Sequence, residues 1–159
     1  MLAQKIIAYF GEDLTGLHFG IWGLSFKPGT DDMREASSLV LIKEIVERGG
    51  KVQAYDPAAM PVEQRLLPAA WLTEQQVVFA EHQFDALKGA DALVLVTEWK
   101  PFCYPDIAAM RKVMRQYVVF DGRNQYDPEH MIDAGFKYYG IGRGRDVKSE
   151  LKQVEMAVV

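Results

Sequence analysis

The fold is decided by one stretch of the chain, Gly20-Ile-Trp-Gly-Leu-Ser-Phe-Lys-Pro-Gly-Thr-Asp-Asp-Met-Arg-Glu-Ala-Ser-Ser38. Its apolar start predicts a buried strand, its charged middle predicts a loop, and an apolar helix follows directly. A loop that joins a parallel strand to a helix lies at the carboxyl edge of the sheet, where α/β folds bind ligands. Lys27 and Arg34, beside a helix N-terminus, favour an anion there, most simply a phosphate.

The rest of the chain alternates strands with helices. Hydrophobic patterning predicts strands at residues 17–22, 51–55, 77–79, 91–97, 117–120 and 136–139. It predicts helices at 2–10, 36–48, 62–67, 83–87, 106–114 and 128–134, and one more near the C-terminus. This alternation is typical of a doubly wound parallel sheet, so we expect a single Rossmann-like α/β domain with a short N-terminal helix.

Composition narrows the class of protein. A chain of 159 residues suits one domain with a full core. The net charge of −4 leaves no basic excess for nucleic acid or an anionic membrane surface. Cys103 is the only cysteine, so no intrachain disulfide forms, which fits a reducing compartment. Because neither a membrane span nor a signal peptide is recognisable, we expect a soluble, cytoplasmic protein.

Three further motifs follow predicted strands, and they read Tyr55-Asp56-Pro57, Thr97-Glu98-Trp99 and Asp121-Gly122-Arg123-Asn124. Parallel strands bring their carboxyl ends to one edge, so these motifs meet the first loop there. Taken in this order, the four motifs resemble the C-terminal, UDP-binding domain of UDP-glucose 6-dehydrogenases. The wider group includes GDP-mannose and UDP-N-acetylmannosamine dehydrogenases. The resemblance covers nearly the whole chain, and chance does not account for four spaced motifs in the same order.

The resemblance implies a role for several residues. Phe26 and Lys27 would contact the UDP-sugar, and Arg123 would bind its nucleotide part, in some members from the partner subunit. Arg34 would reach the NAD that the other domain holds. Each residue also has a purely structural interpretation. Lys27 could be a solvated loop lysine beside a core phenylalanine, Arg34 could form an ion pair within its loop, and Arg123 could be a surface arginine after a turn.

Other candidate sites are less well supported. The carboxylates Asp31, Asp32 and Glu35 suit a hard cation, but their spacing matches no metal loop and two cations lie among them, so we expect them to cap the helix. Asp56 lies where a dinucleotide-binding fold carries its ribose-binding acid, but the first turn lacks G-x-G-x-x-G, so Asp56 is expected to end its strand. Cys103 lies in Pro-Phe-Cys-Tyr-Pro, unlike the family nucleophile in Gly-Gly-Ser-Cys, and is expected to be a half-buried structural cysteine.

The resemblance therefore implies the substrate-binding domain of an NAD-dependent UDP-glucose 6-dehydrogenase, which oxidises UDP-glucose to UDP-glucuronate. Residues 1–12 would end the interdomain linker helix, 13–142 would form the UDP-sugar-binding domain, and 143–159 a tail. The full enzyme would be a homodimer that holds NAD mainly in its N-terminal domain, and this chain would carry no catalytic residue. Two alternatives stay open. One is the same domain of a GDP-mannose or UDP-N-acetylmannosamine dehydrogenase, and the other is a free-standing, non-catalytic nucleotide-binding module.

Overall fold

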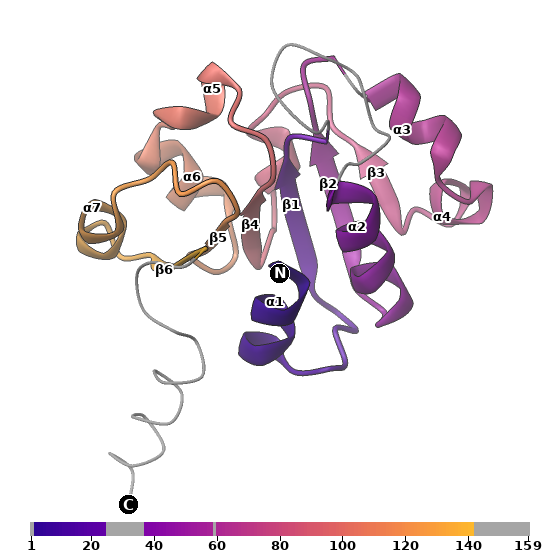
Figure 1. Cartoon of the computed structure of the whole chain (residues 1–159), viewed down its shortest axis with the longest axis horizontal. Coiled ribbons are helices and arrows are strands. Elements are labelled where there is room, and N and C mark those ends of the chain that lie inside the picture. The colour runs from indigo at the N-terminus through magenta and orange to yellow at the C-terminus, as the bar shows by residue number, and fades with distance from the viewer. Residues whose placement is uncertain (1, 25–36, 59, 142–159) are drawn as a thin grey trace, which may run out of the picture.

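The strands form one parallel sheet. The computed structural model describes residues 2–24, 37–58 and 60–141, and within these ranges the sheet has six strands in the order β3-β2-β1-β4-β5-β6 (Figure 1). Every neighbouring pair is parallel. This order is that of the doubly wound dinucleotide-binding fold, and it confirms the predicted fold class. The strands are β1 His18–Trp22, β2 Lys51–Tyr55, β3 Val77–Phe79, β4 Ala92–Leu95, β5 Val118–Asp121 and β6 Lys137–Gly140.

Most of the predicted helices are present, with small shifts of their ends. Two helices were not predicted, α4 and α5, and the helix predicted at 83–87 is a single 3₁₀ turn, η1. Helices this short complete barely one turn, so they leave no hydrophobic period in the sequence. The helix predicted near the C-terminus lies outside the described residues. The helices are α1 Leu2–Phe10, α2 Ser37–Glu47, α3 Met60–Leu66, α4 Ala69–Thr73, η1 Asp85–Leu87, α5 Lys100–Cys103, α6 Ile107–Val113 and α7 Pro128–Asp133.

Helices cover both faces of the sheet. Successive side chains of a strand point to opposite faces, so a strand that is apolar throughout presents apolar side chains on both faces. On β1, Phe19 and Ile21 pack in a core layer with residues of α1 and α2. The neighbouring Trp22 packs in the other layer, with residues of η1, α5, α6 and α7. Figure 1 shows α1 and α2 in front of the strands. The continuous apolar sequence of β4 follows from this arrangement, since all four of its residues are buried.

The N-terminal helix α1 is part of the core. Ile6 is 1% exposed, and the rings of Tyr9 and Phe10 each lie 6.3 Å from the ring of Phe120 on β5. Leu2 packs so close to Gly122 that a Cβ on that glycine would lie 2.7 Å from its side chain. A nine-residue helix is unstable alone, and these contacts with the sheet supply the partner that it needs.

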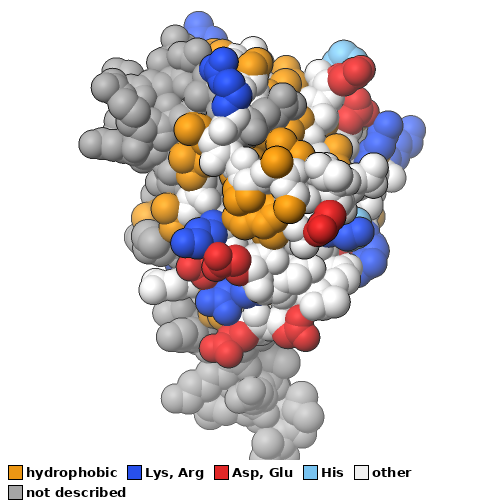
Figure 2. Space-filling view, turned by 90° about the vertical axis from the view of Figure 1, so that its right-hand side faces the viewer, with side chains coloured by type: hydrophobic (Ala, Val, Ile, Leu, Met, Phe, Trp, Pro, Cys, Tyr) orange, Lys and Arg blue, Asp and Glu red, His pale blue; other side chains and the backbone are white. Residues whose placement is uncertain are grey.

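The edge of the sheet at β3 is partly apolar. Val78 on β3 and Leu66 on α3 are exposed by 44% and 52%. Figure 2 faces this side of the molecule, and hydrophobic side chains gather in its centre, with charged groups around them. The edge strand itself is only three residues long, which limits the number of backbone groups that it offers for pairing with another strand.

Candidate functional site

The carboxyl ends of four strands meet at one edge, as the sequence predicts. Trp22 at the end of β1 aligns with Tyr55 of β2 and with Leu95 of β4, and Leu95 aligns with Asp121 of β5. Beyond the strands the backbones stay close. Gly23 has a φ of +92°, and a Cβ there would lie 2.5 Å from Thr97, so this position requires glycine. The described parts of the four motifs therefore lie along one edge of the sheet.

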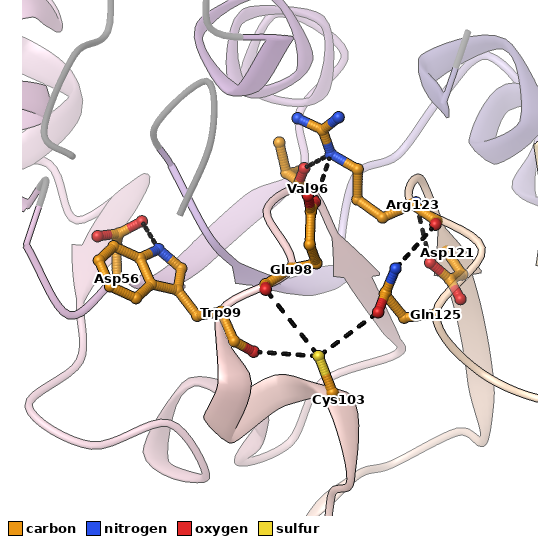
Figure 3. Close-up of polar contacts among 8 residues, drawn as sticks. All are labelled: Asp56, Val96, Glu98, Trp99, Cys103, Asp121, Arg123 and Gln125. Atoms are coloured by element: carbon orange, nitrogen blue, oxygen red, sulfur yellow. Dashed lines mark hydrogen bonds and ion pairs between the residues drawn. The ribbon is translucent and has the colours of Figure 1, made fainter. Parts of the chain in front are cut away.

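Asp56 joins three of these segments. Its Oδ2 accepts the Leu24 N–H at 2.7 Å and the indole N–H of Trp99 at 3.2 Å, as Figure 3 shows for the indole. Its Oδ1 accepts the Ala58 N–H at 2.8 Å. The side chain is fully buried. Asp56 is therefore a structural acid at the end of β2, in agreement with the sequence-based expectation, and both of its oxygens already receive donors from the protein.

The first loop leaves the sheet from a fixed point. The Leu24 N–H is held by Asp56, and the Leu24 carbonyl accepts the hydroxyl of Ser38 at 2.6 Å. Ser38 is buried at the start of α2, so both sides of the loop are tied to each other. Three of the predicted binding residues and the three loop carboxylates lie outside the described residues, and these are Phe26, Lys27, Arg34, Asp31, Asp32 and Glu35.

Asp121 is the second buried acid of the edge. Its Oδ1 accepts the Arg123 N–H at 3.0 Å, and its Oδ2 accepts the Tyr126 N–H at 2.9 Å and the Tyr138 hydroxyl at 2.7 Å. Burial raises the pKa of the Tyr126 hydroxyl far above its ordinary value, and the charge of Asp121 adds to the shift. That hydroxyl therefore stays protonated and donates to the Phe102 carbonyl at 2.6 Å. These contacts fix the turn that carries Arg123.

Arg123 is the predicted binding residue that the structure describes. Its side chain crosses from β5 to the segment after β4, where Nε donates to the Val96 carbonyl at 2.8 Å. The same nitrogen lies 3.0 Å from a carboxylate oxygen of Glu98. Figure 3 shows the guanidinium above Glu98, with its two terminal nitrogens pointing away from Val96 and Glu98. Its side chain is about a third exposed, at 35%.

Cys103 is half-buried near Arg123, as expected of a structural cysteine. Its Sγ lies 3.5 Å from the Trp99 carbonyl and 3.5 Å from Oε1 of Gln125 (Figure 3). Burial raises the pKa of the thiol, and the charges of Glu98 and Asp121 raise it further. A thiol with a raised pKa is a poor nucleophile at neutral pH. Cys103 lies beside a hollow of about 310 Å³, which is lined by side chains of α6 and α7 and of the loops before them. These side chains include Tyr104, Pro105, Ile107, Asp127, His130 and Met131.

The sequence did not reveal the role of Glu98 and Trp99. In the sequence, the motif that contains them contributed only to the resemblance. In the structure, the carboxylate of Glu98 forms an ion pair with Arg123, and the indole N–H of Trp99 donates to Asp56. The sequence did contain a signal for a role at this edge, because both residues directly follow a predicted buried strand, where α/β folds bind their ligands. Among the described residues, no group of three His, Cys, Asp or Glu side chains is arranged to hold a metal ion. Nor does any helix in those ranges have the length and apolarity to cross a membrane.

The described part of this edge of the doubly wound sheet thus carries one oriented cation, Arg123, and two buried structural acids, Asp56 and Asp121. Comparison with known proteins places the chain in a family. The model of the UDP binding domain of the UDP-glucose/GDP-mannose dehydrogenase family matches residues 20–128. The chain belongs to this family. The matched region contains all four motifs of the edge.

Individual relatives agree with this assignment. The chain is 46% identical to a UDP-glucose 6-dehydrogenase of Pseudomonas aeruginosa over 145 residues, covering 91% of this chain and 32% of the relative. It is 37% identical to the UDP-glucose 6-dehydrogenase YwqF of Bacillus subtilis, covering 94% of this chain and 32% of that protein. Among solved structures, a UDP-glucose dehydrogenase from Pyrobaculum islandicum superposes with a TM-score of 0.68 at 28% identity, covering 90% of this chain and 29% of that one. The chain spans about a third of the length of these relatives.

Proposed function

We propose that this chain is the C-terminal, UDP-sugar-binding domain of an NAD-dependent UDP-glucose 6-dehydrogenase. The observation that carries the proposal is Arg123, a partly exposed cation that a hydrogen bond to the Val96 carbonyl and an ion pair with Glu98 hold at the carboxyl edge of the sheet. A guanidinium in this setting suits the bidentate recognition of a phosphate. Membership of the family, and relatives that are named UDP-glucose 6-dehydrogenases, support UDP-glucose as the substrate.

In this proposal the substrate is bound by Arg123 together with Phe26 and Lys27 of the first loop. Arg123 and Lys27 supply positive charge to the diphosphate, and Phe26 supplies an apolar contact. The domain does not itself transfer hydride. It binds and orients the nucleotide part of the substrate, while the sugar is presented to catalytic groups in the other part of the longer chain. Residues 13–142 form this domain, and residues 1–12 end the helix that links it to the rest.

The described residues of this edge do not fit NAD as their own ligand. Asp56 occupies the place of a ribose-binding acid, but it is buried and its oxygens accept protein donors. NAD, which supplies the hydride acceptor in such enzymes, is therefore proposed to bind mainly to the other domain, with Arg34 reaching it across the cleft. The full enzyme is proposed to be a homodimer.

Steady-state kinetics of the full-length enzyme test this division of roles. Lys27→Ala and Arg123→Ala should raise KM for UDP-glucose with little change for NAD, because each removes a charge-assisted contact with the substrate. Arg34→Ala should weaken NAD far more than UDP-glucose. A contact of this kind contributes roughly 1.5–3 kcal/mol, or about ten- to a hundredfold. Equal losses for both ligands in Lys27→Ala and Arg34→Ala, with lowered melting temperatures, would indicate collapse of the shared loop and contradict the proposal.

A further inference from the structure

Gly122 lies between Asp121 and Arg123 in the turn after β5, and it is closely packed. Its φ lies outside the left-handed range that favours glycine, so the backbone conformation does not call for this residue. Space does call for it, because a Cβ at Gly122 would lie 2.7 Å from Cδ1 of Leu2 and 2.8 Å from the carbonyl oxygen of Leu95. The turn is therefore enclosed by the backbone of β4 and by a side chain of α1.

Leu95 and Leu2 hold this turn in different ways. The Gly122 N–H donates to the Leu95 carbonyl at 2.9 Å, a bond that continues the pairing of β4 with β5. Leu2 begins α1 and packs, partly buried, against the core layer on that face of the sheet. Further along the helix, the ring of Tyr9 lies 6.3 Å from the ring of Phe120 on β5. Helix α1 thus contacts both β5 and the turn that follows it.

The other support of the turn acts on the residues after Gly122. Asp121 accepts hydrogen bonds from the N–H groups of Arg123 and Tyr126. Gly122 itself has no side chain to pack, and glycine has more backbone freedom than any other residue. Leu2 fills the space beside it. Loss of the Leu2 side chain should therefore let the turn, and the Arg123 that it carries, take further positions.

We propose that Leu2 is a positioning residue for substrate recognition, which packs on Gly122 and so holds the turn that presents Arg123 at the carboxyl edge of the sheet. The inference rests on the proposed function, in which Arg123 binds the nucleotide part of the substrate and α1 ends the interdomain helix. Leu2 acts on the ligand only through the turn. The helix that joins the two parts of the longer enzyme is then also part of the support of the substrate site.

Substitutions at Leu2 test the contact in the 159-residue chain. Leu2→Ala removes the side chain beside Gly122, whereas Leu2→Met keeps its volume and its reach. Apparent affinity falls in proportion to the fraction of molecules that are competent to bind. If Leu2→Ala leaves the turn in place in roughly a tenth to a half of the molecules, the Kd for UDP rises by about two- to tenfold. The Kd of Leu2→Met should stay within about twofold of the unchanged chain. NMR-detected titration with UDP measures these values.

Leu72→Ala is the matched control. Leu72 on α4 is another partly buried leucine packed against the same core layer, but α4 contacts β3 at the far edge of the sheet. Its substitution should lower the melting temperature without changing UDP binding. In the unliganded chain, Leu2→Ala should broaden the backbone signals of Gly122 and Arg123, because the turn exchanges between positions, and Leu72→Ala should not. In an Arg123→Ala background, Leu2→Ala should cause no further loss of UDP binding.

The possible results separate the inference from the proposed function. An unchanged Kd for UDP in Leu2→Ala, no recovery in Leu2→Met, or a loss that persists in the Arg123→Ala background overturns the inference and leaves the proposed function intact. An equal loss in Leu72→Ala would mean that UDP binding follows global stability, which also overturns it. If UDP does not bind, or Arg123→Ala does not weaken its binding, the proposed function itself fails and the inference fails with it.

Discussion

Asp56 occupies the position after β2 where a dinucleotide-binding fold carries its ribose-binding acid, yet here its carboxylate is used within the protein. It accepts hydrogen bonds from Leu24, Ala58 and Trp99, which belong to three segments of the carboxyl edge. At the scale of single residues, the same side chain in the same place thus serves a different purpose. The deciding factor is burial, because a fully buried carboxylate must be satisfied by protein donors.

Asp56→Asn should lower the free energy of unfolding by about 1–3 kcal/mol. Asparagine has the same shape as aspartate, but its NH₂ group replaces one of the two accepting oxygens. That NH₂ then faces an N–H group of the protein, and at least one buried donor is left without an acceptor. Denaturant unfolding measures the change. Asp85→Asn is a suitable control, because Asp85 forms an exposed ion pair with Lys88 and should alter stability by no more than about 0.5 kcal/mol. Equal stability of Asp56→Asn and the unchanged chain would contradict a structural role.

Cys103 should react slowly with iodoacetamide at neutral pH. Its pKa is raised, chiefly by burial, so less thiolate is present at pH 7 than in the unfolded chain, and the rate should reach half its maximum at a higher pH. The comparison is the rate of alkylation against pH for the folded chain and for the chain in denaturant. A folded chain that reacts faster at pH 7, with a lower midpoint, would instead indicate an activated thiol.

At the scale of elements, the strands were predictable and the short helices were not. The six strands follow from apolar runs and their turn residues, and parallel pairing follows from the helices between them. The helices α4 and α5 depend on contacts rather than on a repeated pattern. Trp71 and Leu72 of α4, for example, pack against the core as two adjacent, partly buried residues, which leave no repeating pattern in the sequence. The N-terminal helix was predicted, but its burial was not, because a nine-residue pattern shows an apolar face without showing what covers it.

Ile6→Ala should destabilise the domain by about 2–5 kcal/mol, because Ile6 is 1% exposed and its removal opens a cavity between α1 and the sheet. Thermal and denaturant unfolding measure the loss. Ile132 on α7 offers a control of the same residue type, since it is 39% exposed and Ile132→Ala should change stability little. A minor effect of Ile6→Ala would mean that α1 is a passive linker and not part of the core.

At the scale of the whole molecule, one edge of the sheet gathers four motifs that lie far apart in the sequence. Topology made this edge predictable, because all parallel strands end on the same side. The contact of Glu98 with Arg123 was not predictable, since it depends on the register of β4 and β5 and on the rotamer of a long side chain. The chain matches about a third of the length of its relatives, so the edge is proposed to be one half of a larger cleft.

The measurement that tests the central claim most directly is an NMR titration of the ¹⁵N-labelled chain with UDP. We expect shifts of backbone signals at the carboxyl edge, at Gly23, Leu24, Thr97 and Arg123, while signals at the opposite edge, such as Lys51 and Gly89, stay in place. Because few charge-assisted contacts are available, the Kd should be about millimolar to high micromolar. Shifts confined to the opposite edge, or no shifts at about 10 mM UDP, more than enough to populate such a complex, would contradict the account.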